Sequence, residues 1–260
     1  LHSHPKVESI MYALRNTPCL TGCDFCNQVF DAHKGLKTFF GFDSYRTYNN
    51  QSLQEDAVKA ALKGKSLLAI FPTGGGKSIT FQVPALMSGE LVKGLTVVIS
   101  PLQSLMKDQV DNLRKYSITD AVTINGLLDP IERSESFERV ENGTASILYI
   151  SPESLRSKSI ERLLLGRKIV RFVIDEAHCF SSWGQDFRVD YLYIGDYIRQ
   201  LQLKKGLVQP IPVSCFTATA KQEVIEDISI YFKEKLNIQL ELFRSNSYRT
   251  NLEYQVFQKS

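Results

Sequence analysis

Two short segments carry side chains that together could cleave a nucleoside triphosphate. Segment 72–78 reads PTGGGKS, and segment 173–178 reads VIDEAH. Consecutive glycines let backbone N–H groups approach phosphate oxygens closely, and a lysine that follows them adds positive charge. An adjacent aspartate and glutamate provide one carboxylate for a divalent cation and a second that orients and deprotonates water. The two segments therefore predict a phosphoryl-transfer site.

The glycine-rich segment has the local context that a phosphate-binding loop requires. The strand-like run LLAIF (67–71) precedes it, and the helix-like run ITFQVPALM follows it. The strict pattern G-x-x-x-x-G-K-[ST] fails at its first position, which is Phe71. A glycine-rich turn with an exposed lysine is the alternative, and the flanking strand and helix argue against it. We expect the phosphates and Mg²⁺ to be held by Thr73, Gly74, Gly75, Gly76, Lys77 and Ser78.

The acidic pair follows the apolar strand-like run RFVI (171–174). In a parallel sheet, ligands bind beyond the carboxyl ends of the strands. Asp175 is therefore expected to hold Mg²⁺ near Lys77 and Ser78, and Glu176 to act as the general base. We expect His178 to relay between the nucleotide and other motifs. An isolated Asp-Glu pair more often caps a helix, but the glycine-rich loop upstream favours catalysis.

The rest of the chain from about residue 52 alternates β-branched apolar runs with amphipathic segments. Amphipathic stretches such as 102–116 and 130–141 lie between the runs. Strands of the buried type that alternate with helices predict an α/β fold, in which helices cover both faces of a parallel sheet of about seven strands. The predicted strands are 67–71, 96–100, 121–124, 146–150, 171–174, 212–216 and, more weakly, 239–243.

Composition narrows the class of protein. The chain has 260 residues, of which 43% are hydrophobic and 23% charged, as in soluble globular proteins. Its net charge of +3 is compatible with nucleic acid but does not argue for it. No apolar run approaches the roughly 18 residues of a membrane helix, so we expect no membrane partner. Five cysteines without a disulfide pattern suggest a reducing compartment: the cytoplasm, near the nucleoid, in a bacterium, or the nucleus in a eukaryote.

Several ordered segments together resemble the RecQ family of superfamily-two helicases over about residues 39–256. The aromatic-rich segment directly after DEAH is the most specific of them. The resemblance implies an ATP-dependent 3′–5′ DNA helicase acting on single-stranded and forked DNA, with residues 39–260 as its first RecA-like domain. The segments that carry the resemblance are FFGFDSYR, SLQEDAV, PTGGGKS, VVISPLQSLMKDQV, LYISPESL, VIDEAH, CFSSWGQDFRVDYLYIG, FTATA and SYRTNLEYQV.

The resemblance also implies roles for individual residues. Gln54 would read the adenine edge of ATP. Thr217 and Thr219 would couple the nucleotide state to DNA. Ser100, Gln103 and Ser104 would lie along the DNA backbone, and Trp183, Phe187 and Arg188 would belong to a loop that senses single-stranded DNA.

Two positions depart from the family pattern. The family carries an arginine three residues before the adenine-reading glutamine, where this chain has Gln51; the nearest arginine is Arg46. The family also carries a histidine after the glycine of the aromatic-rich loop, where this chain has Gln185. A glutamine can donate and accept hydrogen bonds but does not titrate near neutral pH.

The first 38 residues break the rhythm of strands and helices, and we expect them to form a separate appendage. They contain Cys19, Cys23 and Cys26 in a C-x₃-C-x₂-C arrangement, with His33 further along. A zinc or iron–sulfur site needs four ligands, and His33 could be the fourth. Three reduced thiols on a small helical appendage are an equally weighted alternative. The similar cluster motif of radical S-adenosylmethionine enzymes requires a different fold.

Three further expectations complete the sequence-based account. The resemblance implies a second RecA-like domain with arginine fingers, which this chain does not contain, so the chain alone should hydrolyse ATP poorly. A DNA clamp or remodeller that uses ATP without strand separation, and a helicase that acts on RNA, are the rival functions. Basic residues in RLLLGRKIVR (162–171) are expected to form a solvated helix end rather than a phosphate patch.

Overall fold

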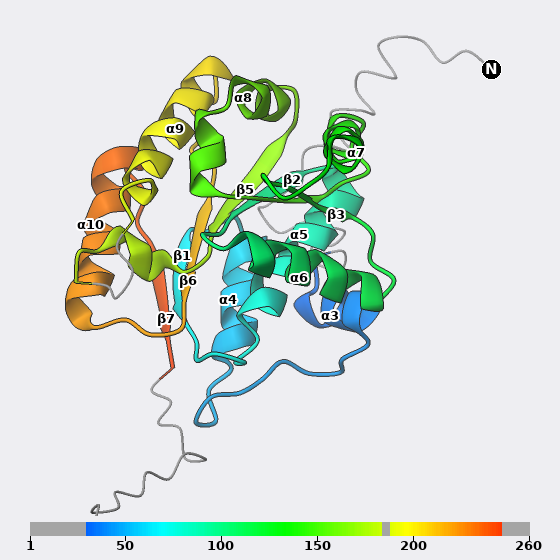
Figure 1. Ribbon diagram of the computed structural model, residues 1–260. Helices are drawn as coiled ribbons and strands as arrows, with labels where there is room; N and C mark the ends of the chain where they lie inside the picture. The colour runs from blue at the N-terminus through cyan, green and yellow to red at the C-terminus, as the bar shows by residue number, and fades with distance from the viewer. Residues whose placement is uncertain (1–29, 184–187, 246–260) are drawn as a thin grey trace, which may run out of the picture.

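The computed structural model describes residues 30–183 and 188–245 (Figure 1). Strands and helices alternate along almost the whole of this part of the chain. The elements in chain order are α3 (Ala32–Phe40), α4 (Leu53–Leu62), β1 (Leu67–Ile70), α5 (Lys77–Val92), β2 (Leu95–Ile99), α6 (Gln103–Lys115), β3 (Ala121–Ile124), α7 (Pro130–Glu141), β4 (Ile147–Ile150), the 3₁₀ turn η1 (Pro152–Arg156), α8 (Lys158–Leu165), β5 (Ile169–Ile174), the 3₁₀ turn η2 (Ala177–Phe180), α9 (Tyr191–Lys204), β6 (Val213–Thr217), α10 (Gln222–Leu236) and β7 (Glu241–Arg244).

The seven strands form one parallel sheet in the order β3-β4-β2-β5-β6-β1-β7. Each predicted strand is present, including the weak seventh, which pairs with β1 at the sheet edge. Strands β1 to β6 are almost wholly buried, because helices cover both faces, and this explains their continuous apolar sequences. The predicted α/β fold with a RecA-like parallel sheet is confirmed.

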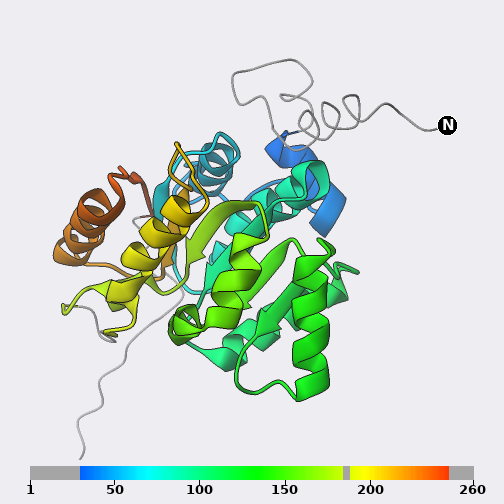
Figure 2. The ribbon, with the colours of Figure 1, turned by 90° about the horizontal axis from the view of Figure 1, so that it is seen from above.

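The helices divide into two layers with separate cores. Helices α3, α4, α5 and α6 cover one face of the sheet, and α7, α8, α9 and α10 cover the other. In Figure 2 the blue-to-teal helices lie above and to the right of the sheet, and the green-to-orange helices lie below and to the left of it. Alternate residues of each strand enter opposite cores; for example, Ala69 packs in the first layer and Ile70 in the second.

The register of the central strands brings the predicted site segments together. Ile70 at the end of β1 pairs with Thr217 at the end of β6, and Ile174 of β5 pairs with Cys215 of β6. Ile99 at the end of β2 pairs with Ile174. The loops that follow these four neighbouring strands therefore leave the sheet at the same edge, where α/β proteins bind ligands.

Helix ends follow local sequence signals. Asp129 caps α7 and completes a capping box with Glu132, with Pro130 at the first helical position. Asp31 caps α3 by accepting a hydrogen bond from the backbone of Lys34. No helix in the described ranges is long and apolar enough to cross a membrane.

Two findings qualify the sequence-based organisation. Helix α3 runs through residue 38 and packs on α5, where Gly35 lies against Met87. The division into an appendage and a RecA-like domain at that residue stays a prediction. The expectation that the basic residues of 162–171 form a solvated helix end is wrong for Arg171, because α8 ends at Leu165 and Arg171 is buried in β5.

Candidate nucleotide-binding site

The glycine-rich loop joins β1 to α5 and needs backbone conformations that only glycine adopts easily. Gly74 has φ 73° and Gly76 has φ 83°, both in the left-handed region. Gly75 closes the turn, because its N–H donates to the Pro72 carbonyl over 2.8 Å. A Cβ atom on Gly75 would lie 2.7 Å from that same oxygen. Helix α5 begins at Lys77, so its first-turn N–H groups have no intrahelical acceptor and can face an anion.

A tyrosine that the sequence reasoning missed supports this loop. The Tyr48 hydroxyl donates to the carbonyl of Gly75, and its ring stacks on Phe71 with 5.0 Å between centroids. Phe71 is the residue that breaks the strict loop pattern, and the stacking explains how the chain accommodates it. Because a trans peptide is planar, fixing the Gly75 carbonyl also fixes the N–H of Gly76 on the opposite side. The aromatic pair therefore orients the phosphate-binding backbone.

The structure explains the departure at Gln51. Tyr48 and Gln51 pair through two backbone hydrogen bonds of 2.9 Å, with Asn49 and Asn50 both at positive φ between them. A two-residue hairpin turn of this kind needs positive φ at both central residues, and asparagine adopts that conformation more easily than most residues. It takes up the extra residues between Arg46 and the helix of Gln54, so that these two residues still meet.

Arg46 and Gln54 both contact the glycine-rich loop. The Arg46 guanidinium donates to the carbonyl of Gly74, and the Arg46 N–H donates to Gln54 Oε1 over 2.7 Å. Gln54 Nε2 donates to the carbonyl of Gly76 over 2.9 Å. Arg46 therefore reaches the phosphate loop despite its shifted sequence position. Gln54 is buried, and both ends of its amide have partners within the chain, so this structure shows it as a support of the loop.

The acidic pair lies beside the loop lysine. Lys77 Nζ is 3.6 Å from Glu176 Oε1, and the side chains of both residues are largely shielded from solvent. Glu176 has φ 49°, which is unusual for a residue with a long side chain. The backbone of Asp175 is fixed from two sides: its N–H donates to Ile99 of β2, and its carbonyl accepts from the Tyr191 hydroxyl at 2.9 Å.

The two carboxylates have pKa values shifted in opposite directions. Burial, reinforced by the charge of Glu176, raises the pKa of Asp175 to about 6. The hydrogen bond from His178 and the charge of Lys77 lower the pKa of Glu176 despite its partial burial. Asp175 is therefore a carboxylate that lacks a strong positive partner within the described residues. A divalent cation would supply that positive charge.

His178 links the acidic pair to the end of β6. Its Nδ1 lies 3.2 Å from Glu176 Oε2 and 3.0 Å from Thr217 Oγ1. The Thr217 hydroxyl in turn donates to the carbonyl of Thr219 over 3.0 Å. Contacts with Cys179 and Glu176 raise the pKa of His178. A protonated Nδ1 can donate to both neighbours, so one continuous path runs from Glu176 to Thr219.

The aromatic residues after DEAH have different environments. Phe180 is buried, with its ring 4.7 Å from that of Tyr231 and 5.2 Å from that of Tyr191. Trp183 is 71% exposed, and its backbone N–H donates to Ser181 Oγ at 3.2 Å. Phe180 is thus a core residue, and Trp183 is free to stack on a ligand. Phe187 and Gln185 lie outside the described residues, so their predicted roles stay predictions.

The predicted DNA-backbone segment after β2 contacts the far end of the same loop. Arg188 Nη1 donates to the carbonyl of Pro101 over 3.2 Å. Ser104 is exposed at the start of α6, and Gln103 is half-buried. Ser100 is buried, and its hydroxyl has no hydrogen-bond partner among the described residues. Ser104 is therefore the member of this set most open to a polymer at the surface.

Cys19, Cys23 and Cys26 lie outside the described residues. His33, the suggested fourth ligand, contacts a carboxylate instead: its Nε2 is 2.9 Å from Glu55 Oε1. Within residues 30–183 and 188–245 no group of three or more acidic, histidine or cysteine side chains could hold a metal ion. The zinc or iron–sulfur site stays a prediction.

The remaining donor set fits a nucleoside triphosphate with a divalent cation. The first turn of α5 offers N–H groups, Lys77 offers a cation, and Asp175 offers a carboxylate without a strong positive partner. Ser78 is half-buried in the same first turn and carries a hydroxyl. Fold and site together define a RecA-like P-loop nucleotide-binding domain.

Comparison with known proteins identifies the family of this domain. Residues 51–228 match the model of the DEAD/DEAH box helicase family, so the chain belongs to that family. The RecQ prediction is confirmed by relatives at about 40% identity. One is a probable ATP-dependent DNA helicase, RecS of Bacillus subtilis, 40% identical over 193 residues that cover 74% of this chain and 35% of the relative.

A second relative, the ATP-dependent DNA helicase RecQ of Bacillus subtilis, is 41% identical over 207 residues, covering 79% of this chain and 32% of the relative. The chain therefore spans about a third of the length of these relatives. Among solved structures, the helicase MrfA bound to DNA and AMPPNP aligns with a TM-score of 0.63 over 83% of this chain and 29% of that one. At 20% identity, that similarity supports the fold alone.

Proposed function

We propose that this chain is the ATP-binding motor half of a RecQ-like, ATP-dependent 3′–5′ DNA helicase. One observation carries the proposal: Lys77, Glu176, His178 and Thr217 form a connected path at the edge of the sheet where β1, β5 and β6 end. Such a path would allow ATP hydrolysis and DNA binding to influence each other. The polarity of unwinding follows from the resemblance to RecQ helicases.

The residues divide the hydrolytic work between them. Bound Mg²⁺ supplies charge neutralisation of the phosphates, and Asp175 and Ser78 would hold it. The first-turn N–H groups of α5 and the Lys77 ammonium bind phosphate oxygens. Glu176 orients a water and accepts its proton, and its lowered pKa keeps the carboxylate ionised for that task at neutral pH. Lys77, 3.6 Å from Glu176 here, would turn to the phosphates.

The same residues connect hydrolysis to nucleic acid. Trp183 offers an exposed ring on the segment that begins at Glu176, and aromatic rings stack on unpaired bases of any sequence. Arg188 joins the other end of that segment to Pro101, beside the predicted backbone-binding residues. If a bound DNA strand shifted the segment from Glu176 to Arg188, the position of the Glu176 carboxylate would therefore change as well. We propose Thr219 and Ser104 as further points of contact with the strand.

A strand-displacement assay on the full-length protein tests this function. Forked DNA with a 3′ single-stranded tail should be unwound in the presence of ATP, whereas a fork with only a 5′ tail should not. Hydrolysis without displacement would support an ATP-driven DNA clamp instead. Stronger stimulation of hydrolysis by single-stranded RNA than by DNA would move the substrate to RNA.

Two further parts of the proposal concern the remainder of the protein. A second RecA-like domain would supply arginine side chains to the phosphates and complete the DNA track. Zinc or an iron–sulfur cluster at Cys19, Cys23 and Cys26 is the other part. Metal analysis of anaerobically purified protein decides it, and absence of stoichiometric zinc and iron rules it out. A DNA substrate places the protein with the chromosome, in the cytoplasm of a bacterium or the nucleus of a eukaryote.

A further inference from the structure

A separate cavity lies at the edge of the sheet opposite the nucleotide site. Its lining includes residues that precede or begin strands: Ser66 before β1, Thr96 in β2 and Pro212 before β6. The catalytic residues, in contrast, follow the ends of β1, β5 and β6. The cavity measures about 600 Å³, within the range of about 300–1,000 Å³ that is typical of small-molecule sites.

Arg171 is the most unusual residue of this cavity. It lies in the middle of the apolar central strand β5 and is only 5% exposed. Its guanidinium donates to the carbonyl of Ala61 over 2.7 Å, to the carbonyl of Lys65 over 2.9 Å and to Ser214 Oγ over 2.8 Å. All three acceptors are neutral, and no carboxylate in the described part of the chain forms an ion pair with it.

This arrangement leaves a buried positive charge incompletely compensated. A guanidinium has five N–H donors, and the three hydrogen bonds leave two for another partner. The carboxyl end of α4, near Ala61, contributes only a partial negative charge of about one half. Burial of a cation without an opposite charge is costly. Burial lowers the pKa of Arg171 to about 10, which still leaves it protonated at neutral pH.

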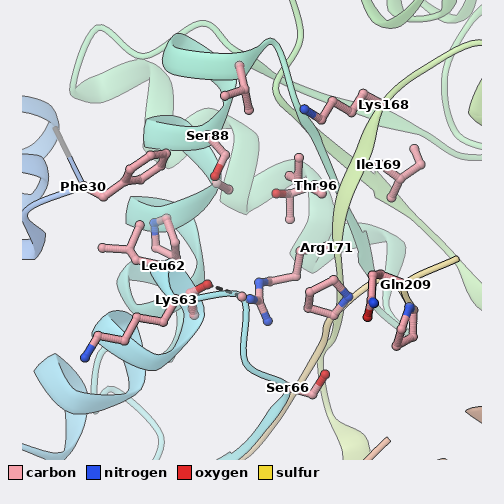
Figure 3. A pocket seen from close by; sticks show the side chains of 18 residues that line it. Phe30, Leu62, Lys63, Ser66, Ser88, Thr96, Lys168, Ile169, Arg171 and Gln209 are labelled. Carbon is pink, nitrogen blue, oxygen red and sulfur yellow. Dashed lines mark hydrogen bonds between the residues drawn. The ribbon is translucent and has the colours of Figure 1, made fainter. Parts of the chain in front are cut away.

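The rest of the lining suits an apolar molecule. Phe30, Leu62, Pro84, Val92 and Ile169 contribute apolar side chains, and none of the described residues that line the cavity is an aspartate or glutamate. Figure 3 shows Arg171 in the middle of the lining residues, with Phe30 and Leu62 on one side and Gln209 on the other. Such a mixture of an apolar wall and one convergent charged group is typical of sites that bind small organic ligands.

The lysines of the lining have the same sign of charge as Arg171. Lys63 and Lys168 are exposed and form no ion pair with a described acidic residue. Because both are positively charged, neither can neutralise the buried guanidinium. They add to a positive potential that would attract an anion toward the cavity.

We propose that this cavity binds a small organic acid, with its apolar body against the lining and its single carboxylate on the Arg171 guanidinium. Carboxylates match the forked geometry of a guanidinium and form charge-assisted hydrogen bonds with it. One buried cation calls for one negative charge, and the mainly apolar wall favours a monocarboxylate over a strongly hydrated polyanion. This site does not depend on the proposed function, because it shares no residue with the nucleotide site.

Isothermal titration calorimetry of the full chain with octanoate tests the proposal. Below its micelle concentration, octanoate should bind saturably at one molecule per chain. Octanol, which has the same apolar body without the charge, should bind at least about tenfold more weakly, because it forms no charge-assisted bond. Failure of the full chain to bind octanoate, or equal affinity for octanol, would overturn the proposal.

Two variants locate the binding. Ser88→Phe should abolish binding, because Ser88 is half-buried in the lining on α5 and the ring would fill the cavity without touching the nucleotide loop. Ser134→Phe, on the exposed face of α7, is the matched control and should bind normally. Arg171→Met should reduce octanoate affinity to that of octanol. Unchanged binding by folded Ser88→Phe protein would contradict the assignment even if Arg171→Met fails to fold.

Discussion

At the scale of residues, the site depends on side chains that hold the phosphate loop as much as on those that would touch phosphate. Lys77 and Glu176 were identifiable from their motifs, because the glycine-rich loop with its lysine favours a catalytic role for the carboxylate pair after a buried strand over a helix cap. Tyr48 was not, because its role comes from a contact with Gly75 across 27 positions of sequence. Only the folded hairpin at 48–51 brings it there.

Glu176 should be essential for hydrolysis but not for binding. Replacing it with glutamine keeps the shape and removes the proton acceptor, so the full-length protein should still bind ATP while turnover falls at least about 100-fold. Fluorescent-nucleotide binding and phosphate release measure the two properties. Normal turnover by Glu176→Gln would remove this residue as the base.

Tyr48→Phe should weaken nucleotide binding more than it slows chemistry. The substitution keeps the stacking on Phe71 but loses the hydrogen bond to Gly75, a loss of about 0.5–1.5 kcal/mol. We expect the KM for ATP to rise about threefold to tenfold with little change in kcat.

Tyr197→Phe is the matched control for this experiment. It also removes a buried tyrosine hydroxyl, but one that has no hydrogen-bond partner among the described residues, and its ring lies in the opposite layer. It should leave KM unchanged. If the two variants raise KM equally, Tyr48 acts through general stability rather than through the loop.

At the scale of elements, the segment from η2 to α9 joins a packed half to an exposed half. Phe180 anchors it in the core between α9 and α10, and Trp183 presents a ring to solvent only three residues later. An anchored segment with an exposed tip can respond to a ligand without disturbing the core. This division gives the two aromatic residues different expected phenotypes.

Trp183→Ala should spare hydrolysis in the absence of DNA and reduce its stimulation by single strands. Loss of about 1–3 kcal/mol of stacking should raise the half-saturating DNA concentration about fivefold or more. Steady-state ATPase titrations with single-stranded DNA measure both quantities. Trp183→Phe should restore most of the effect, and Val189→Ala, which alters another exposed apolar side chain of the loop, should be neutral. Equal loss of basal and stimulated rates would make Trp183 structural.

The elements also show where sequence reasoning succeeds and fails. Strands β1 to β6 were predictable because strands that are buried on both faces have continuous apolar sequences rich in β-branched residues. Arg171 was misjudged, because a charged residue at the start of the predicted strand 171–174 suggests a solvated position. Its guanidinium is buried instead and donates to the carbonyl groups of Ala61 and Lys65 and to Ser214 Oγ, which lie far away in the sequence. The meeting of Arg46 with Gln54 depends on a hairpin turn, which a fixed motif spacing does not anticipate.

At the scale of the whole molecule, the described site has few positive groups around the phosphates. Besides His178, which is committed to Glu176 and Thr217, the cations that contact the loop or the acidic pair in the described ranges are Lys77 and Arg46. An added arginine contributes about 10³–10⁵ in rate in related phosphoryl-transfer systems. We therefore expect the 260-residue chain alone to hydrolyse ATP at most about a thousandth as fast as the full-length protein with DNA. Comparable rates would show that the chain contains its complete catalytic set.

Hydrolysis at the Lys77–Glu176 site should depend on nucleic acid. The most direct measurement is the ATPase rate of the full-length protein as a function of single-stranded DNA concentration, with Glu176→Gln as the blank. The rate should rise saturably, by about tenfold or more, as the strand occupies the loop that carries Trp183. A rate that is independent of DNA at every concentration would show that this site is not coupled to nucleic acid.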